Sequence, residues 1–80
     1  MTNLEVNVRH LDGQTLQCDA HRVTVLDEAM VLSISPGHAL LLAPLVESKV
    51  TIHGNDTHTL FVQSGLLRVE PDRVSMTVFH

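Results

Sequence analysis

Aromatic residues are nearly absent from this 80-residue chain, which has no tryptophan, no tyrosine and two phenylalanines. Because 44% of the residues are still hydrophobic, the core must be built from aliphatic side chains. A chain of this length buries about 60–65% of the surface that its unfolded state exposes. We therefore expect residues 1–80 to form a single domain with an aliphatic core, and few side chains on which a nucleic acid base could stack.

Clustered positive charge is lacking as well. Nine acidic residues outweigh five basic ones, giving a net charge of −4, and the basic residues are scattered along the chain: Arg9, Arg22, Lys49, Arg68 and Arg73. A protein that binds the phosphate backbone needs clustered positive charge. We therefore expect no nucleic acid partner. The six histidines make the surface charge sensitive to pH between about 5 and 7.

Secretion and membrane signals are also missing. Cys18 is the single cysteine, so no internal disulfide can form, and a reducing compartment is the simpler expectation. The N-terminus has neither the basic nor the apolar segment of a secretion signal. The longest apolar run, residues 39–46, is far shorter than the ~20 residues that span a bilayer. We expect a cytoplasmic protein with no segment inserted in the membrane.

Apolar residues instead alternate with polar ones along most of the chain. Leu4, Val6 and Val8 show this period of two, and Asp12-Gly13 then provides a turn. The same alternation recurs at residues 16 and 18, 23 and 25, 32 and 34, 50 and 52, 60 and 62, 67 and 69, and 74, 76 and 78. Each of these segments is predicted to be a short, separate strand.

These strands predict an all-β fold, because no apolar residues recur at helical spacing for the length of a stable helix. Turn signals every eight to twelve residues indicate a small antiparallel β-sandwich or flattened barrel, with no C-terminal helical hairpin. Pro36-Gly37 and Pro44 bracket the apolar run. That run is therefore expected to form an irregular corner followed by one short strand.

No arrangement of residues in the sequence indicates catalysis. Cys18 falls on the apolar side of its strand, where a thiol is usually inert. Ser64-Gly65 lacks the strand-to-helix elbow of a serine nucleophile, and Asp27 and Glu28 are neighbours in a turn, where their carboxylates diverge. We expect a protein that is not an enzyme and needs no cofactor.

His53 and His58 flank a turn over residues 54–57, so a hairpin could bring their imidazoles together. A tight zinc site needs three or four ligands, and only Asp56 lies close to this pair in the sequence. Solvated turn histidines are the favoured interpretation. A small metal-binding barrel of the cupin type, built on His53, His58 and another histidine, is the alternative. A module that self-associates through its exposed edge strands is a third possibility.

Two stretches resemble the epsilon subunit of F-type ATP synthases. Residues 32–41, LSISPGHALL, are similar to the family segment LGI(L/Y)PGHAPLL. Residues 61–71 and 74–78, FVQSGLLRVEP and VSMTV, are similar to (F/V)xxGGxLEVxPxxVTVLAD, and residues 4–8 fit the family's first strand. The resemblance extends over essentially the whole chain.

The resemblance implies the N-terminal β-sandwich of that subunit, a non-catalytic part of the central stalk. In the family this domain docks on the gamma subunit with one face and on the c-ring with one end, so that rotation stays coupled to ion transport. The chain would then belong to a bacterial complex that translocates H⁺ or Na⁺, peripheral on the cytoplasmic face of the inner membrane.

Matching positions imply two contact regions. The segment near gamma would contain His38, Ala39, Leu41 and Leu42, and the turn of Ala29, Met30 and Val31 would point toward the c-ring. For Leu41 and Leu42 the alternative is an ordinary place in the core. Met30 and Val31 are better contact candidates than core candidates, because exposed apolar side chains in a turn need a partner.

The sequence departs from the family pattern at several points. Relatives carry glycines and an acidic residue in the turn before LGI, whereas Met30 and Val31 stand here, which predicts an apolar contact in place of a polar one. Leu66 replaces the second glycine of the GG pair, and Leu40 replaces the proline that follows PGHA. The inhibitory two-helix domain of the family does not appear in these 80 residues, so its properties are not implied.

Overall fold

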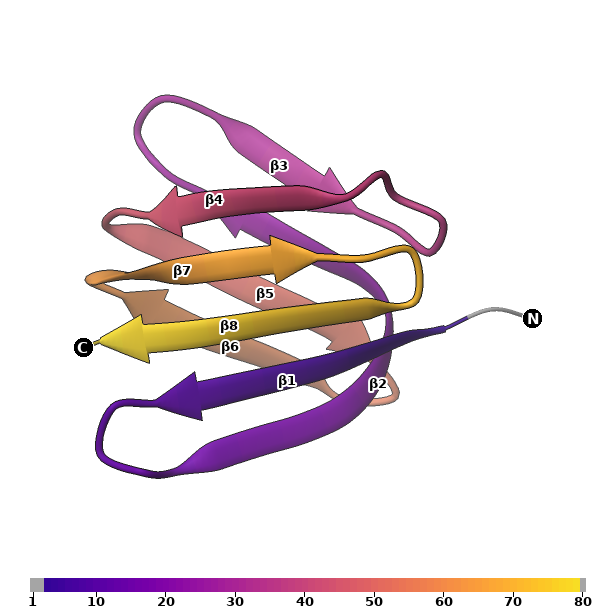
Figure 1. The fold of residues 1–80 in the computed structure, drawn as a ribbon, viewed down its shortest axis with the longest axis horizontal. Coiled ribbons are helices and arrows are strands. Elements are labelled where there is room, and N and C mark those ends of the chain that lie inside the picture. The colour runs from indigo at the N-terminus through magenta and orange to yellow at the C-terminus, as the bar shows by residue number, and fades with distance from the viewer. Residues whose placement is uncertain (1–2, 80) are drawn as a thin grey trace.

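The computed structural model describes residues 3–79, and over this range the chain forms eight β-strands and no helix (Figure 1). The strands are β1 (Leu4–His10), β2 (Thr15–Leu26), β3 (Val31–Ile34), β4 (Leu41–Leu45), β5 (Ser48–Gly54), β6 (Thr57–Val62), β7 (Ser64–Val69) and β8 (Arg73–Phe79). The predicted all-β fold is confirmed.

The strands form two packed layers. They are hydrogen-bonded in the order β4-β7-β8-β1-β2-β5-β6, with β3 also paired to β2. The front layer in Figure 1 contains β4, β7, β8, β1 and the first part of β2, and the back layer contains β3, the second part of β2, β5 and β6. The long strand β2 therefore belongs to both layers and joins them into a sandwich.

The prediction of separate strands around residues 16–18 and 23–25 is wrong, because β2 is continuous. A register shift between Ala20 and Arg22 marks a β-bulge, in which one extra residue bends the strand. The buried positions accordingly change phase, from Ala20 before the bulge to Val23 and Val25 after it. The polar residues between the two apolar segments are the bend itself, not a loop.

One strand pair departs from the predicted antiparallel arrangement. β1 and β8 run parallel, with Val6 opposite Val74 and Val8 opposite Met76, whereas every other pair in the described range is antiparallel. The chain reaches β8 only after passing through both layers. Alternation within a strand fixes which face is buried but carries no information on which strand lies beside it.

The core between the layers is aliphatic, as the composition predicts. All its buried hydrophobic residues are Val, Leu, Ile, Ala or Met, and neither phenylalanine is among them. Each fully buried side chain of this size contributes about 1.5–3 kcal/mol relative to exposure. The largest fully buried ones are Leu4, Ile34, Ile52 and Leu67. Stability therefore depends on close packing of many similar side chains from both layers.

The apolar run folds as predicted, into an irregular corner and one short strand. Pro44 lies in β4, which among the described strands pairs with β7 alone and forms the edge of the front layer, where a residue without an N–H is tolerated. Gly37 in the corner has a φ of 87°, and its N–H donates to the carbonyl of Pro71, 2.7 Å away. The corner is thus tied to the β7–β8 turn.

Candidate interaction surface

One end of the sandwich gathers most of the exposed apolar side chains. The β1–β2, β2–β3, β4–β5 and β6–β7 connections and the C-terminal end of β8 lie together there, on the left in Figure 1. We call this region the apolar end, because seven of the ten exposed large hydrophobic residues within residues 3–79 belong to it: Leu11, Leu26, Met30, Val31, Val46, Phe61 and Phe79.

The β2–β3 turn holds Met30 at this end through one carboxylate. Asp27 accepts hydrogen bonds from the N–H groups of Ala29 and Met30, at 2.7 and 2.8 Å, and its own N–H donates to the Met30 carbonyl. This Asx-type turn leaves Met30 51% and Val31 66% exposed. Val31 was expected in this turn, but it is the first residue of β3.

A row of exposed side chains crosses the back layer at the same end. Val31 lies opposite Leu26, Leu26 opposite Lys49, and Lys49 opposite Phe61, so four adjacent strands each contribute one residue. Cross-strand partners share a face of the sheet. Three of the four side chains are apolar, and Phe61 is 71% exposed.

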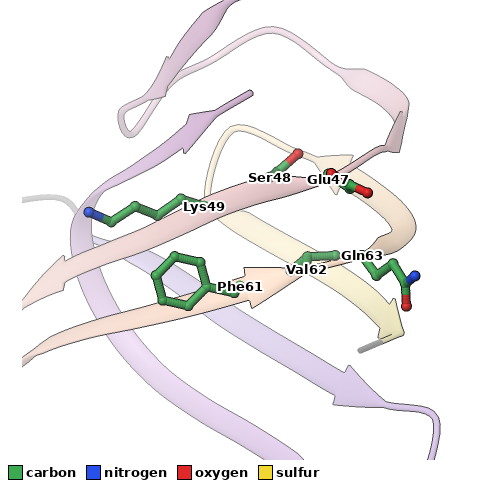
Figure 2. Close-up of a pocket in the computed structure, with 6 residues that line it drawn as sticks. All are labelled: Glu47, Ser48, Lys49, Phe61, Val62 and Gln63. Carbon is green, nitrogen blue, oxygen red and sulfur yellow. The ribbon is translucent and has the colours of Figure 1, made fainter. Parts of the chain in front are cut away.

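The row borders a shallow hollow of about 540 Å³ between β5 and β6. Figure 2 shows Lys49 and Phe61 projecting from neighbouring strands, with Glu47 and Gln63 at the far end of the same hollow. Its floor is formed in part by Ser48, whose hydroxyl donates to the Val46 carbonyl. The hollow is open and mixed in polarity, which suits contact with a protein surface better than enclosure of a small molecule.

The residues expected near gamma differ in exposure. His38 follows the β3–β4 corner at the opposite end of the sandwich from Met30, and its Nδ1–H donates to the Ala39 carbonyl at 2.7 Å. Leu41 is partly buried and packs against the core, whereas Leu42 is 66% exposed. The core alternative therefore holds for Leu41 and fails for Leu42.

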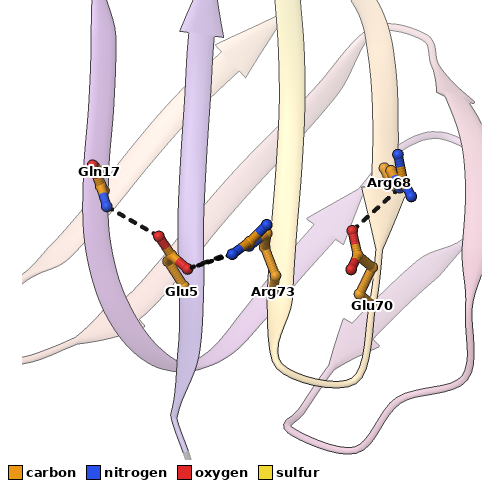
Figure 3. A network of polar contacts seen from close by, with 5 residues as sticks. All are labelled: Glu5, Gln17, Arg68, Glu70 and Arg73. Atoms are coloured by element: carbon orange, nitrogen blue, oxygen red, sulfur yellow. Dashed lines mark hydrogen bonds and ion pairs between the residues drawn. The ribbon is translucent and has the colours of Figure 1, made fainter.

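The outer face of the front layer is polar, and much of its charge is paired (Figure 3). The Glu5 carboxylate accepts from Gln17 Nε2 at 3.0 Å and from the Arg73 guanidinium, whose Nη2 lies 3.2 Å away. Arg68 and Glu70 form a second pair at 3.3 Å. These side chains are partly exposed, so each pair stabilises the fold only slightly.

The hairpin does not bring His53 and His58 together, as the metal-binding alternative would require. His53 lies opposite Thr57 and His58 opposite Ile52, and adjacent pairs of a ladder point to opposite faces of the sheet. His53 instead lies beside His21, with ring centroids 6.4 Å apart, and its Nε2 is 3.2 Å from the Thr24 hydroxyl. Within residues 3–79 no group of three or more His, Cys, Asp or Glu residues is placed to hold a metal ion.

Cys18 packs against the core, as its place in the alternation predicts. Burial raises the pKa of its thiol, and the neighbouring Asp19 carboxylate raises it further. The thiolate is the reactive form of cysteine. The environment of Cys18 is therefore the opposite of that of a nucleophile.

The family comparison agrees with this geometry. Residues 3–78 match the model of the ATP synthase delta/epsilon chain beta-sandwich domain. The chain belongs to this family. The resemblance of residues 32–41 and 61–78 to the epsilon subunit is thereby confirmed, as is the sandwich architecture.

The relatives of this epsilon-type sandwich include the ATP synthase epsilon chain of Anoxybacillus flavithermus, 34% identical over 77 residues, and that of Bacillus pumilus, 32% identical over 77 residues. Both alignments cover 95% of this chain, but 58% and 59% of the two relatives. The chain thus spans less than two thirds of the length of the relatives it matches.

A solved structure shows the same fold. It is a chain in the cryo-EM structure of the central stalk and c-ring of Tetrahymena thermophila mitochondrial ATP synthase, with a TM-score of 0.78 and 18% identity. The match covers 96% of the epsilon-type sandwich and 63% of that chain. Within residues 3–79, no helix has the length and hydrophobicity to cross a membrane.

Two features of the surface escaped the sequence analysis. Asp27 was considered only as a possible acid or base. An aspartate can instead accept hydrogen bonds from the N–H groups two and three residues later, as Asp27 does from Ala29 and Met30, and aspartate is for this reason a recognisable turn residue. The row that ends in Phe61 had no local signal, because it combines residues from four strands that only the register brings together.

Proposed function

We propose that this epsilon-type sandwich is a non-catalytic element of the central stalk of a bacterial F-type ATP synthase, where it contacts the gamma subunit and the c-ring. In this position it holds gamma to the ring, so that rotation and the transport of H⁺ or Na⁺ stay coupled. The family match over residues 3–78 and the solved stalk chain of the same fold both support this role.

The apolar end is the observation that carries the proposal. Exposed apolar residues concentrated at one end of a small domain mark a site of contact with another molecule. The Asp27 turn fixes Met30 in its exposed position, so the contact surface is formed before a partner binds. A preorganised, stiff surface suits a joint that transmits torque, because little ordering is needed on binding.

The six proposed contact residues divide between the partners. Met30 and Val31 at the apolar end would face the c-ring, and His38, Ala39, Leu41 and Leu42 would lie on the gamma side. Leu42 is the strongest of the second group, because its side chain is exposed on the edge strand β4. Leu41 would act indirectly, by packing β4 against the core.

The remaining features are those of a binding domain. We propose no catalytic chemistry on this chain, and the raised pKa of the Cys18 thiol is in keeping with that. Its place would be peripheral, on the cytoplasmic face of the inner membrane, through the rest of the complex.

Co-expression tests the proposal. The tagged chain is produced together with the gamma homologue encoded in the same genome, and the eluate is analysed for both proteins. We expect gamma to co-purify, and Leu42→Asp to reduce its recovery while Thr15→Asp, at an exposed position on β2 at the opposite edge of the front layer from β4, does not. A chain that recovers no gamma and elutes as a tight homodimer would instead favour self-association through its edge strands.

A further inference from the structure

The outward side chains of the back layer form a second surface, which we call the back face. It consists of three cross-strand rows. The first is the row of Val31, Leu26, Lys49 and Phe61, the second is a row of hydroxyls from Ser33, Thr24, Thr51 and Thr59, and the third contains Arg22, His53 and Thr57.

The three rows of the back face carry positive charge and no negative charge, although Glu47 lines the far end of the hollow beside Lys49. Residues 22–26, β3, β5 and β6 contain no Asp or Glu, although the whole chain has nine acidic residues and a net charge of −4. Within residues 3–79 neither Lys49 nor Arg22 forms an ion pair. On the front face, Arg68 and Arg73 are paired with carboxylates, whereas Arg9 forms no ion pair within the described residues. The cations of the back face are thus available to an outside carboxylate.

We propose that the back face docks an acidic, amphipathic segment of a partner protein. Apolar side chains of the segment would cover Leu26 and Phe61, while Val31 at the end of the same row would remain with the c-ring. Two carboxylates of the segment would meet Lys49 and Arg22. The proposal rests on the proposed function for the source of the segment, which would be the gamma subunit.

The register sets the spacing of the two carboxylates. Arg22 is the cross-strand partner of His53, and His53 lies four residues from Lys49 along β5. At about 3.3 Å per residue the two cations are separated by about 13 Å along the strand direction. That distance corresponds to about nine residues of an α-helix. The row between them consists of short Thr and Ser side chains, so a helix can lie across it.

Other occupants fit the back face less well. Two cations are too few for a membrane surface or a nucleic acid, which attract proteins through clusters of basic residues. A second copy of the chain, docked through the same face, would bring its own Lys49 and Arg22 against cations instead of carboxylates. A protein segment with carboxylates therefore matches the charge of this face best.

Charge reversal tests the proposal in the complex with the co-expressed gamma homologue. Lys49→Glu is compared with Arg9→Glu, which makes the same charge change at an exposed position on the front face. We expect Lys49→Glu to weaken gamma binding about tenfold and Lys49→Glu with Arg22→Glu to weaken it further, while Arg9→Glu has little effect. Circular dichroism melts of all variants show that the fold persists.

Photo-crosslinking locates the segment. p-Benzoylphenylalanine in place of Thr59 on the back face is compared with the same residue in place of Thr77 on the front face. We expect Thr59 to crosslink to a gamma peptide rich in Asp and Glu, and a Lys substitution of those acids to restore the binding lost in Lys49→Glu.

The outcomes separate the two proposals. If wild-type chain and Lys49→Glu bind gamma equally, the back-face proposal is wrong and the proposed function stands. If the wild-type chain does not bind gamma, both fail. Two other results would also overturn the back-face proposal, if Lys49→Glu leaves gamma binding unaltered. One is flotation of the chain with phosphatidylglycerol vesicles that depends on Lys49. The other is a homodimer that Lys49→Glu breaks.

Discussion

Gly65 on β7 lies directly opposite Val78 on β8, so closely that a Cβ atom at Gly65 would overlap the Thr77 carbonyl oxygen and lie 3.2 Å from Val78 Cα. These neighbours are backbone atoms of β8, so they cannot rotate away as a side chain could. Gly65, the first glycine of the family's GG pair, is thus required here by the close packing of β7 and β8. Leu66, which replaces the second glycine, is half exposed.

Gly65→Ala should therefore lower the free energy of unfolding by about 1–3 kcal/mol, because the two strands must separate to admit the methyl group. Ser64→Ala, an exposed change at the preceding position, should stay within about 0.5 kcal/mol of the wild type. Urea denaturation followed by circular dichroism measures both. Equal stabilities for Gly65→Ala and the wild type would show that the β7–β8 spacing is wrong.

Met30→Asp and Val31→Asp should leave the thermal midpoint within about 3 °C of the wild type, because both side chains are exposed at the apolar end. The same substitutions should weaken assembly on the c-ring. Ile34→Ala, in the same strand as Val31 but fully buried, should cost about 2–5 kcal/mol. Differential scanning calorimetry checks the contrast, and a midpoint drop in Met30→Asp as large as that in Ile34→Ala would make Met30 a core residue.

The histidines near the β5–β6 turn should bind no stoichiometric zinc, because His53 and His58 point to opposite faces of the sheet. Elemental analysis of protein purified without chelator should find well under one zinc per chain. His53→Ala should lower stability by about 0.5–1.5 kcal/mol through loss of the hydrogen bond to Thr24. One zinc per chain, lost in both His53→Ala and His58→Ala, would revive the metal-binding interpretation.

Cys18 should react slowly with DTNB at pH 8, because burial and Asp19 both raise the pKa of its thiol. Asp19→Asn should speed the reaction by removing the neighbouring charge. The folded state holds the thiol proton more tightly than the unfolded state, so this contribution to stability is complete below about pH 8.5 and is lost as pH rises above that value. If Cys18 of the folded protein reacts with DTNB as fast as Cys18 of protein unfolded in 6 M guanidinium chloride, the thiol is not protected as described.

The positions of the strands could be predicted from the sequence because each one alternates between a buried and an exposed face. The bend in β2 was also encoded, since buried residues fall at Ala20 and then at Val23, a step of three instead of two. That change of phase indicates a bulge within one strand, but it was interpreted as a gap between two.

The surfaces could be predicted only in part. Met30 was a good candidate because an apolar residue beside a turn signal is recognisable locally. The row from Val31 to Phe61 and the neighbourhood of His53 and His21 depend on which strands pair and in which register. Those pairings join segments distant in the chain, and no local pattern of alternation determines them.

A native mass spectrum of the chain co-expressed with its gamma homologue tests the central claim most directly. The stalk role predicts a 1:1 complex that survives dilution and is lost in Leu42→Asp. A spectrum that contains the folded chain and folded gamma as separate species, with no 1:1 complex, would contradict it.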